Sequence, residues 1–133
     1  MNFRIVNCPD KDFKPFVERA AQFYAKELIY NTRIRNNCHT EIRFCPNIDE
    51  FGYASIEDYN TKNKPRRFLI EINPLIGSRR ILETLAHEMV HQWEYLVYEN
   101  MTHGPKFFQW RDELAKYNIV LSRAYRIRHY KLD

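Results

Sequence analysis

The sequence predicts an α+β fold with an N-terminal helix, a small three-stranded antiparallel sheet and two further helices. Three observations favour it: apolar residues recur at helical spacing near the N-terminus, three short alternating stretches follow between residues 40 and 72, and a long helical pattern begins at Ser78. The chain has 133 residues, of which 44% are hydrophobic and 29% charged, enough to bury a core without disulfides. We therefore expect one globular domain spanning residues 1–133.

The first helix is expected from about Phe13 to Tyr30. Asp12 is a plausible N-cap, and Pro15 falls in the first turn, where its missing N–H costs nothing. The apolar residues that recur at helical spacing are Phe13, Phe16, Val17, Ala20, Ala21, Tyr24 and Leu28.

Three stretches are predicted to be strands and to form the antiparallel sheet. Residues 40–45 alternate in polarity before Pro46, and residues 52–59 alternate more weakly. Residues 67–72 form the clearest strand, which ends at Asn73-Pro74. We expect the strand that ends near Ile72 to present an edge with which an extended peptide can pair.

A long helix is predicted from Ser78, as N-cap, to about Tyr98. A further helix is expected from Gly104-Pro105 to about Tyr117, since proline is accepted in the first turn. The buried stripe of the long helix consists of Ile81, Leu82, Leu85, Ala86, Met89, Val90, Trp93 and Val97.

The long helix contains His87-Glu88-Met89-Val90-His91, a His-Glu-x-x-His motif. Residues four apart lie on one face of a helix, so both imidazoles can reach one zinc ion at about 2.0–2.1 Å. Glu88 then projects beside the metal, where it can take a proton from a metal-bound water and pass it to a leaving amine. A histidine pair alone can be surface decoration, but the complete motif on a convincing helix is much more specific.

A catalytic zinc site needs a third protein ligand and one open position. Metzincin spacing would place glycine at position 94 and histidine at position 97, and Glu94 and Val97 exclude it. A thermolysin-like site would use a glutamate from the next helix, for which Glu113 is the candidate. His103 is the better candidate, because Gly104-Pro105 can form a turn that carries it back to the metal.

Residues 83–91, followed by His103-Gly104-Pro105-Lys106-Phe107, resemble the SprT-like zinc metallopeptidase family, which includes the Spartan-like proteases that act on DNA–protein crosslinks. The resemblance covers the chain from the first helix to Tyr117. It implies a zinc-dependent endopeptidase in which His87, His91 and His103 hold Zn²⁺ and Glu88 is catalytic. It also implies a helix, a three-stranded sheet and two metal-bearing helices.

The cysteines distinguish this chain from many members of the family, which continue into a four-cysteine zinc ribbon. Here no cysteine follows Cys45, so a protease domain without the ribbon is expected. The other cysteines are Cys8 and Cys38, and the odd number without Cys-x-x-Cys spacing favours reduced thiols. A second metal site at Cys38, His39 and Cys45 is disfavoured for the same reason.

The net charge of +4 permits contact with nucleic acid. The final segment interleaves Tyr125 and Tyr130 with basic residues that could contact phosphates: Arg123, Arg126, Arg128 and Lys131. A solvated terminal strand explains this segment equally well. Lys62, Lys64, Arg66 and Arg67 form a second basic cluster, and Arg79-Arg80 a third.

The expected partners are a protein substrate and DNA, the latter bound weakly and without sequence preference. The sequence shows no signal peptide and no apolar stretch of membrane-spanning length, so an intracellular monomer is expected, cytoplasmic or in the nucleus or nucleoid. Tyr53, Tyr125 and Arg126 are candidates for stabilising the oxyanion. The alternative function is a non-catalytic, zinc-stabilised DNA-binding module, against which Glu88 argues because a structural zinc site needs no base.

Overall fold

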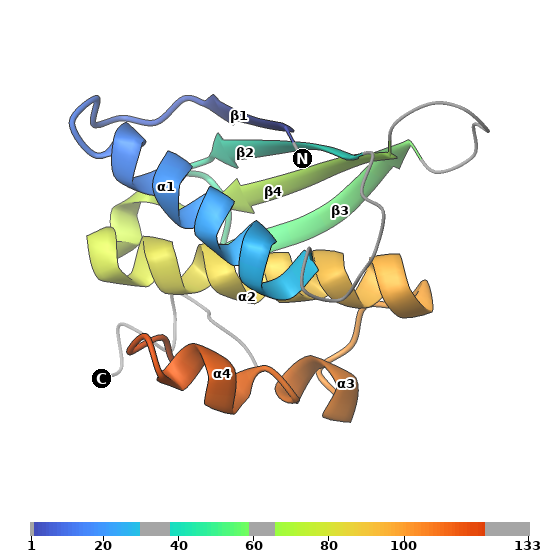
Figure 1. Ribbon diagram of the computed structural model, residues 1–133. Helices are drawn as coiled ribbons and strands as arrows, with labels where there is room; N and C mark the ends of the chain where they lie inside the picture. The colour runs from blue at the N-terminus through green and yellow to red at the C-terminus, as the bar shows by residue number, and fades with distance from the viewer. Residues whose placement is uncertain (1, 30–37, 59–65, 122–133) are drawn as a thin grey trace.

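The computed structural model describes residues 2–29, 38–58 and 66–121 (Figure 1). Helix α2 (Ser78–Tyr98) lies between the sheet and the short helices α3 (Pro105–Phe108) and α4 (Arg111–Ala115). Helix α1 (Lys14–Tyr24) packs beside α2 on the same face of the sheet. The predicted α+β class is confirmed, and α2 is the central element of the fold.

The sheet differs from the predicted one in strand number and direction. It contains β1 (Asn2–Val6), β2 (Cys38–Phe44), β3 (Gly52–Asp58) and β4 (Arg66–Ile72), in the order β1-β2-β4-β3. Strands β1 and β2 are parallel, as are β2 and β4, and only β3 and β4 are antiparallel. The prediction of three antiparallel strands was therefore wrong. It missed that β1, α1 and β2 form a strand–helix–strand unit, a connection that makes two neighbouring strands parallel.

Strand β4 is hydrogen-bonded on both sides, so the predicted edge near Ile72 does not exist. Its run of buried residues from Phe68 to Ile70 is typical of a central strand. Within the described sheet, β3 is an outer strand, and both β3 and β4 contact α2.

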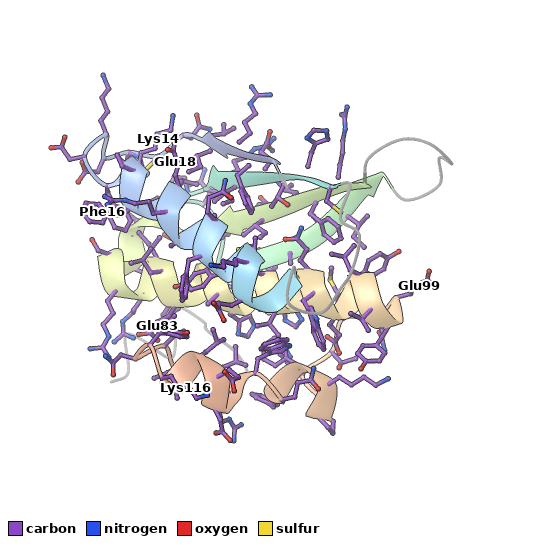
Figure 2. All side chains as sticks on the ribbon, viewed as in Figure 1. Lys14, Phe16, Glu18, Glu83, Glu99 and Lys116 are labelled. Atoms are coloured by element: carbon purple, nitrogen blue, oxygen red, sulfur yellow. The ribbon has the colours of Figure 1, made fainter. Side chains whose placement is uncertain are left out.

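Helix α1 and the π-helical turn η1 (Ala25–Ile29) together occupy the range predicted for the first helix. Pro15 lies in the first turn as expected, but the N-cap is Phe13, not Asp12. The reason is an Asx turn, in which the carboxylate of Asp10 accepts a hydrogen bond from the Asp12 N–H at 2.9 Å. Figure 2 shows Lys14, Phe16 and Glu18 on the outer side of α1, away from the core.

Helix α2 has the predicted bounds. The prediction that Ser78 is the N-cap was wrong, because the N-cap is Gly77, with φ of 88°, and Ser78 is the first helical residue. The preceding 3-10 turn η3 (Pro74–Ile76) is capped by the buried Asn73, whose side chain accepts a hydrogen bond from Leu75 and donates one to the carbonyl of Ile48. These contacts fix where α2 begins relative to β4.

The single helix predicted from residue 105 to residue 117 is instead divided into α3 and α4. Trp110 separates them with φ of −87° and ψ of −3°, a bridge conformation that interrupts an α-helix. Phe107 of α3 and Leu114 of α4 are both buried in the core. In the part of the chain that the structure describes, no helix is long and apolar enough to cross a membrane.

Candidate metal centre

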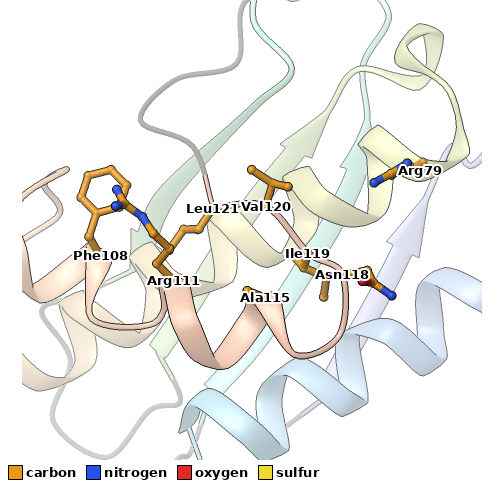
Figure 3. A pocket seen from close by; sticks show the side chains of 8 residues that line it. All are labelled: Arg79, Phe108, Arg111, Ala115, Asn118, Ile119, Val120 and Leu121. Carbon is orange, nitrogen blue, oxygen red and sulfur yellow. The ribbon is translucent and has the colours of Figure 1, made fainter.

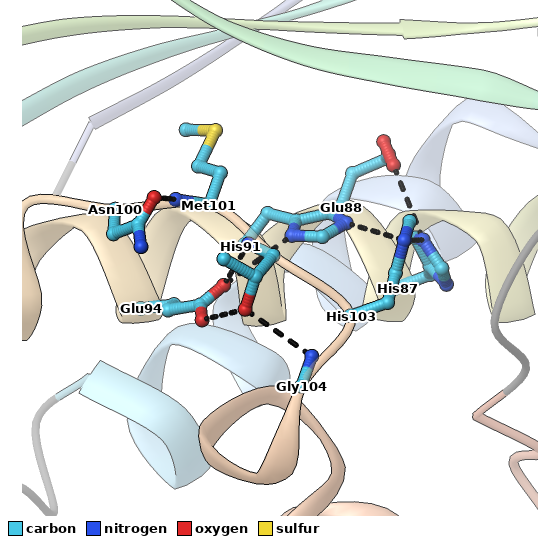
Figure 4. Close-up of polar contacts among 9 residues, drawn as sticks. His87, Glu88, His91, Glu94, Asn100, Met101, His103 and Gly104 are labelled. Atoms are coloured by element: carbon cyan, nitrogen blue, oxygen red, sulfur yellow. Dashed lines mark hydrogen bonds and ion pairs between the residues drawn. The ribbon is translucent and has the colours of Figure 1, made fainter.

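His87 and His91 lie one turn apart on α2, as the motif predicts, on the side that faces α3 (Figure 4). The helix is anchored to the sheet on its other side, where the Gln92 side chain donates to the Thr40 hydroxyl at 2.8 Å. Both histidines are buried, with 5% and 8% of their surface exposed, and their ring centroids are 4.9 Å apart. Packing in the core therefore fixes the orientation of both imidazoles.

His103 completes a cluster of three imidazoles. Its Nε2 atom lies 3.1 Å from Nε2 of His91 and 3.2 Å from Nε2 of His87. Nitrogen ligands at about 2.0–2.1 Å from a tetrahedral zinc ion are roughly 3.3 Å from one another. The Nε2 atom of His103 thus lies at this separation from those of His91 and His87. The ligand nitrogens of the three histidines all lie within 4.8 Å of one another, and His103 lies at the solvent-exposed side of the cluster.

Phe107, at the start of α3, packs against all three imidazoles. Its ring centroid is 4.8 Å from that of His87, 4.5 Å from that of His91 and 5.1 Å from that of His103. The aromatic residue of the His-Gly-x-x-Phe segment therefore supports the histidine cluster directly.

Glu88 lies beside the cluster, with its Oε1 atom 3.7 Å from Nε2 of His87. The side chain is buried, and its Oε2 atom has no hydrogen-bond partner. Burial, followed by the negative charge of Glu50, raises the pKa of Glu88 to about 8. A buried carboxylate oxygen with no partner is what a site that receives a water molecule or a cation would contain.

The electrostatics at His91 favour the form that binds a metal. Burial, followed by the neighbouring His103, lowers the pKa of His91 to about 4, and Glu94 opposes this shift. At neutral pH the imidazole is therefore uncharged, with a lone pair for a metal ion.

Glu94 also lies at this site, and its contacts with the histidine cluster and the following loop were not predicted from the sequence. It is 1% exposed and accepts two hydrogen bonds of 2.7 Å from Thr102, one from the backbone N–H and one from the hydroxyl. Its Oε1 atom also lies 3.7 Å from Nδ1 of His91. Its position three residues after His91, on the same helix face, was the available signal.

The other residues proposed as metal ligands do not join the cluster. Glu113 is on α4, where its half-exposed carboxylate pairs with Lys116 at 3.0 Å. Cys38, His39 and Cys45 form no group that could hold a metal among the described residues. Cys45 instead donates to the carboxylate of Glu71 at 3.4 Å, and burial together with that carboxylate raises the pKa of its thiol.

Of the candidates for oxyanion stabilisation, Tyr53 is part-exposed and donates to the Asp49 carboxylate at 2.6 Å. Tyr125 and Arg126 lie outside the described residues, as do Lys62 and Lys64 of the second basic cluster. The four basic residues predicted to contact nucleic acid are also outside them: Arg123, Arg126, Arg128 and Lys131.

Arg79, from the third basic cluster, lines a pocket of about 650 Å³ between the start of α2 and α4 (Figure 3). Arg111 lines the same pocket and lies over the ring of Phe108, 4.6 Å from its centroid. None of the three clustered histidines lines this pocket, so it is separate from the candidate metal centre.

Comparison with known protein families shows to which family the chain belongs. The family model described as the SprT-like family matches residues 21–127, which is most of the sequence. The chain belongs to the SprT-like family. No curated protein and no solved structure matches it. The matched range of this SprT-like chain includes α2, the three histidines and Glu88, and the family is associated with zinc metallopeptidase-like proteins.

Proposed function

We propose that this SprT-like protein is a zinc-dependent endopeptidase. The observation that carries the proposal is the convergence of three histidine nitrogens beside a buried glutamate. His87, His91 and His103 would hold the metal. When bound, zinc would supply a Lewis acid that lowers the pKa of a water molecule to about 7.

Glu88 is the proposed general base and acid. It would accept a proton from the attacking water and deliver it to the nitrogen of the leaving amine. Its pKa of about 8 is near neutrality, and a cation at the histidines would lower it further toward the working pH. Its burial keeps bulk water from competing for the transferred proton.

We propose that the substrate binds as an extended peptide along β3. This strand lies at the outer edge of the described sheet, and Gly52 at its start lies close to Glu88. A β-carbon at Gly52 would be 3.5 Å from Cγ of Glu88, so the beginning of the strand adjoins the reacting region. Backbone pairing at such an edge would hold a peptide with little dependence on its sequence.

The proposed natural substrates are proteins bound or crosslinked to DNA. The support is the net charge of +4 and the basic residues near the C-terminus. The alternative is a non-catalytic, zinc-stabilised DNA-binding module. The buried Glu88 favours the enzyme, because an unpartnered carboxylate oxygen is costly and a purely structural site gains nothing from it.

The test compares wild-type protein with Glu88→Gln, using a DNA-bound protein as substrate with and without added zinc. Glutamine preserves the shape of the side chain but cannot accept the proton, so the cleavage rate should fall on the order of 10²-fold or more. Zinc content should be unchanged. Glu83→Gln, the same exchange on α2 outside the motif, should cleave like wild type. Equal rates for wild type and Glu88→Gln would refute the role of Glu88, and zinc binding without any cleavage would favour the alternative.

A further inference from the structure

Glu94 is a fully buried carboxylate that both ligand-bearing segments contact. It belongs to α2, one turn after His91, and its two oxygens accept hydrogen bonds from Thr102, the residue before His103. A buried carboxylate is costly unless it is well hydrogen-bonded, and here both bonds are made with one residue of the ligand-bearing loop. The carboxylate of Glu94 therefore connects α2 to the following loop at Thr102, directly before His103.

The contact with His91 is made by Oε1 of Glu94, the oxygen that also accepts from the Thr102 N–H. Nδ1 of His91 is buried and has no hydrogen-bond partner, and Oε1 of Glu94 is 3.7 Å away. When Nε2 of a histidine binds a metal, Nδ1 carries the proton, and such ligands usually donate this N–H to a carboxylate or a carbonyl. A movement of less than about 1 Å would bring the pair to hydrogen-bond distance.

We propose that Glu94 is a positioning residue of the metal centre: it orients His91 through Nδ1 and holds His103 in place through Thr102. This inference rests on the proposed function, because it assumes a metal ion bound to the three histidines. One buried carboxylate thereby aligns two of three ligands that come from different segments. Its carboxylate charge also makes His91 a stronger ligand.

Two variants separate the two contacts. In Glu94→Gln the amide oxygen can still accept from the Thr102 N–H and the amide nitrogen can donate to its hydroxyl, so the loop stays in place while the negative charge beside His91 is lost. Thr102→Val removes the hydroxyl contact and keeps the charge. Glu99→Gln, the same carboxylate-to-amide exchange at the exposed end of α2, is the matched control.

The experiment measures the zinc dissociation constant of each full-length variant by competition with a chromogenic chelator, together with the melting temperature of the metal-free protein. We expect Glu94→Gln to weaken zinc binding by roughly 10–100-fold, with no lower melting temperature of the metal-free protein. Thr102→Val should also weaken zinc binding. In a variant with both changes, the loss of zinc affinity should be less than the product of the two separate losses, because the two side chains are coupled. Glu99→Gln should bind zinc like wild type.

Zinc affinities equal to wild type in both Glu94→Gln and Thr102→Val would overturn the inference and leave the zinc peptidase proposal intact. A lower melting temperature without a change in affinity would also overturn it, because that is the result of a purely structural residue. If Glu94→Gln does not fold, Thr102→Val decides, through its affinity and through the visible spectrum of its cobalt(II) form. Wild type that binds no zinc would refute the proposed metal site and this inference with it.

Discussion

At Gly52, at the start of β3, there is no room for a β-carbon beside α2 and β4. A β-carbon there would lie 2.6 Å from Cγ2 of Thr84 and 2.8 Å from the carbonyl oxygen of Glu71. Because the second contact is with backbone, side-chain rotation cannot relieve it. Glycine is thus required where the edge strand passes the proposed base.

Gly52→Ala should destabilise the protein by about 1–3 kcal/mol, the usual cost of overpacking. Urea denaturation of the purified protein measures this free energy. Gly104→Ala is the matched control, because a β-carbon there meets only the Thr102 hydroxyl at 3.4 Å. Equal stabilities for the two variants would contradict the packing described at Gly52.

Tyr24 links α1 to α2 through a hydrogen bond from its hydroxyl to the carbonyl of Leu82 at 3.2 Å. Burial, followed by the charge of Glu83, raises its pKa from 10.0 to about 12. Since the folded pKa is the higher one, the stability contributed by the protonated hydroxyl is complete below pH 10 and is lost as the pH rises toward 12. Within that window the free energy of unfolding should fall by about 1.4 kcal/mol for each pH unit.

Tyr24→Phe should therefore remove most of the decline in stability between pH 10 and 12, although it loses a hydrogen bond at neutral pH. Denaturation midpoints of wild type and variant across this range provide the measurement. A wild type whose stability relative to Tyr24→Phe stays constant up to pH 12 would contradict the raised pKa.

Individual residues of the site differ in how far sequence could predict them. His87, Glu88 and His91 follow from helix geometry alone, because their spacing places them on adjoining positions of one turn. The part of Glu94 could not be predicted, since it depends on a loop that returns Thr102 to the helix. The spacing of a motif indicates which residues share a helix face, but it does not indicate which distant backbone N–H group donates a hydrogen bond to a residue on that face.

At the scale of elements, the third histidine of the cluster comes from the loop between α2 and α3, and Glu113 of α4 does not join the cluster. His103→Ala should lose zinc binding, whereas Glu113→Ala should keep it, since Glu113 pairs with Lys116 on the surface of α4. Elemental analysis after dialysis distinguishes them. Loss of zinc in Glu113→Ala with retention in His103→Ala would restore the thermolysin-like arrangement.

The elements that sequence predicted best were those with long, regular patterns. Helix α2 was predicted with its bounds because 21 residues carry one apolar stripe. Strand β1 was missed because five residues are too few for an alternating pattern to be recognised. Its partner β2 is also more than thirty residues away in the sequence. The positions of β3 and β4 in the sheet depend on tertiary packing, and the alternation of polarity within a single strand does not predict that packing.

At the scale of the whole molecule, we predict weak DNA binding with strong salt dependence and no sequence preference. The basis is the net charge of +4 and the cluster Arg123, Arg126, Arg128 and Lys131. Dissociation constants should be roughly 10⁻⁴–10⁻⁶ M at physiological salt, because each neutralised phosphate releases counterions. Truncation after Leu121 should weaken binding without loss of zinc, which anisotropy titrations can follow. Binding unaffected by the truncation would direct attention to the Arg79 and Arg111 pocket.

The zinc content of the purified protein is the decisive test of the metal centre. Elemental analysis should find about one zinc ion per chain in wild type and almost none in the double variant His87→Ala, His91→Ala, with both proteins folded by circular dichroism. The reason is that Nε2 of His103 already lies 3.1 Å from Nε2 of His91 and 3.2 Å from Nε2 of His87, about the separation of ligands on one ion. Undiminished zinc in the double variant, or a folded wild type that takes up no zinc, would contradict the proposed three-histidine site.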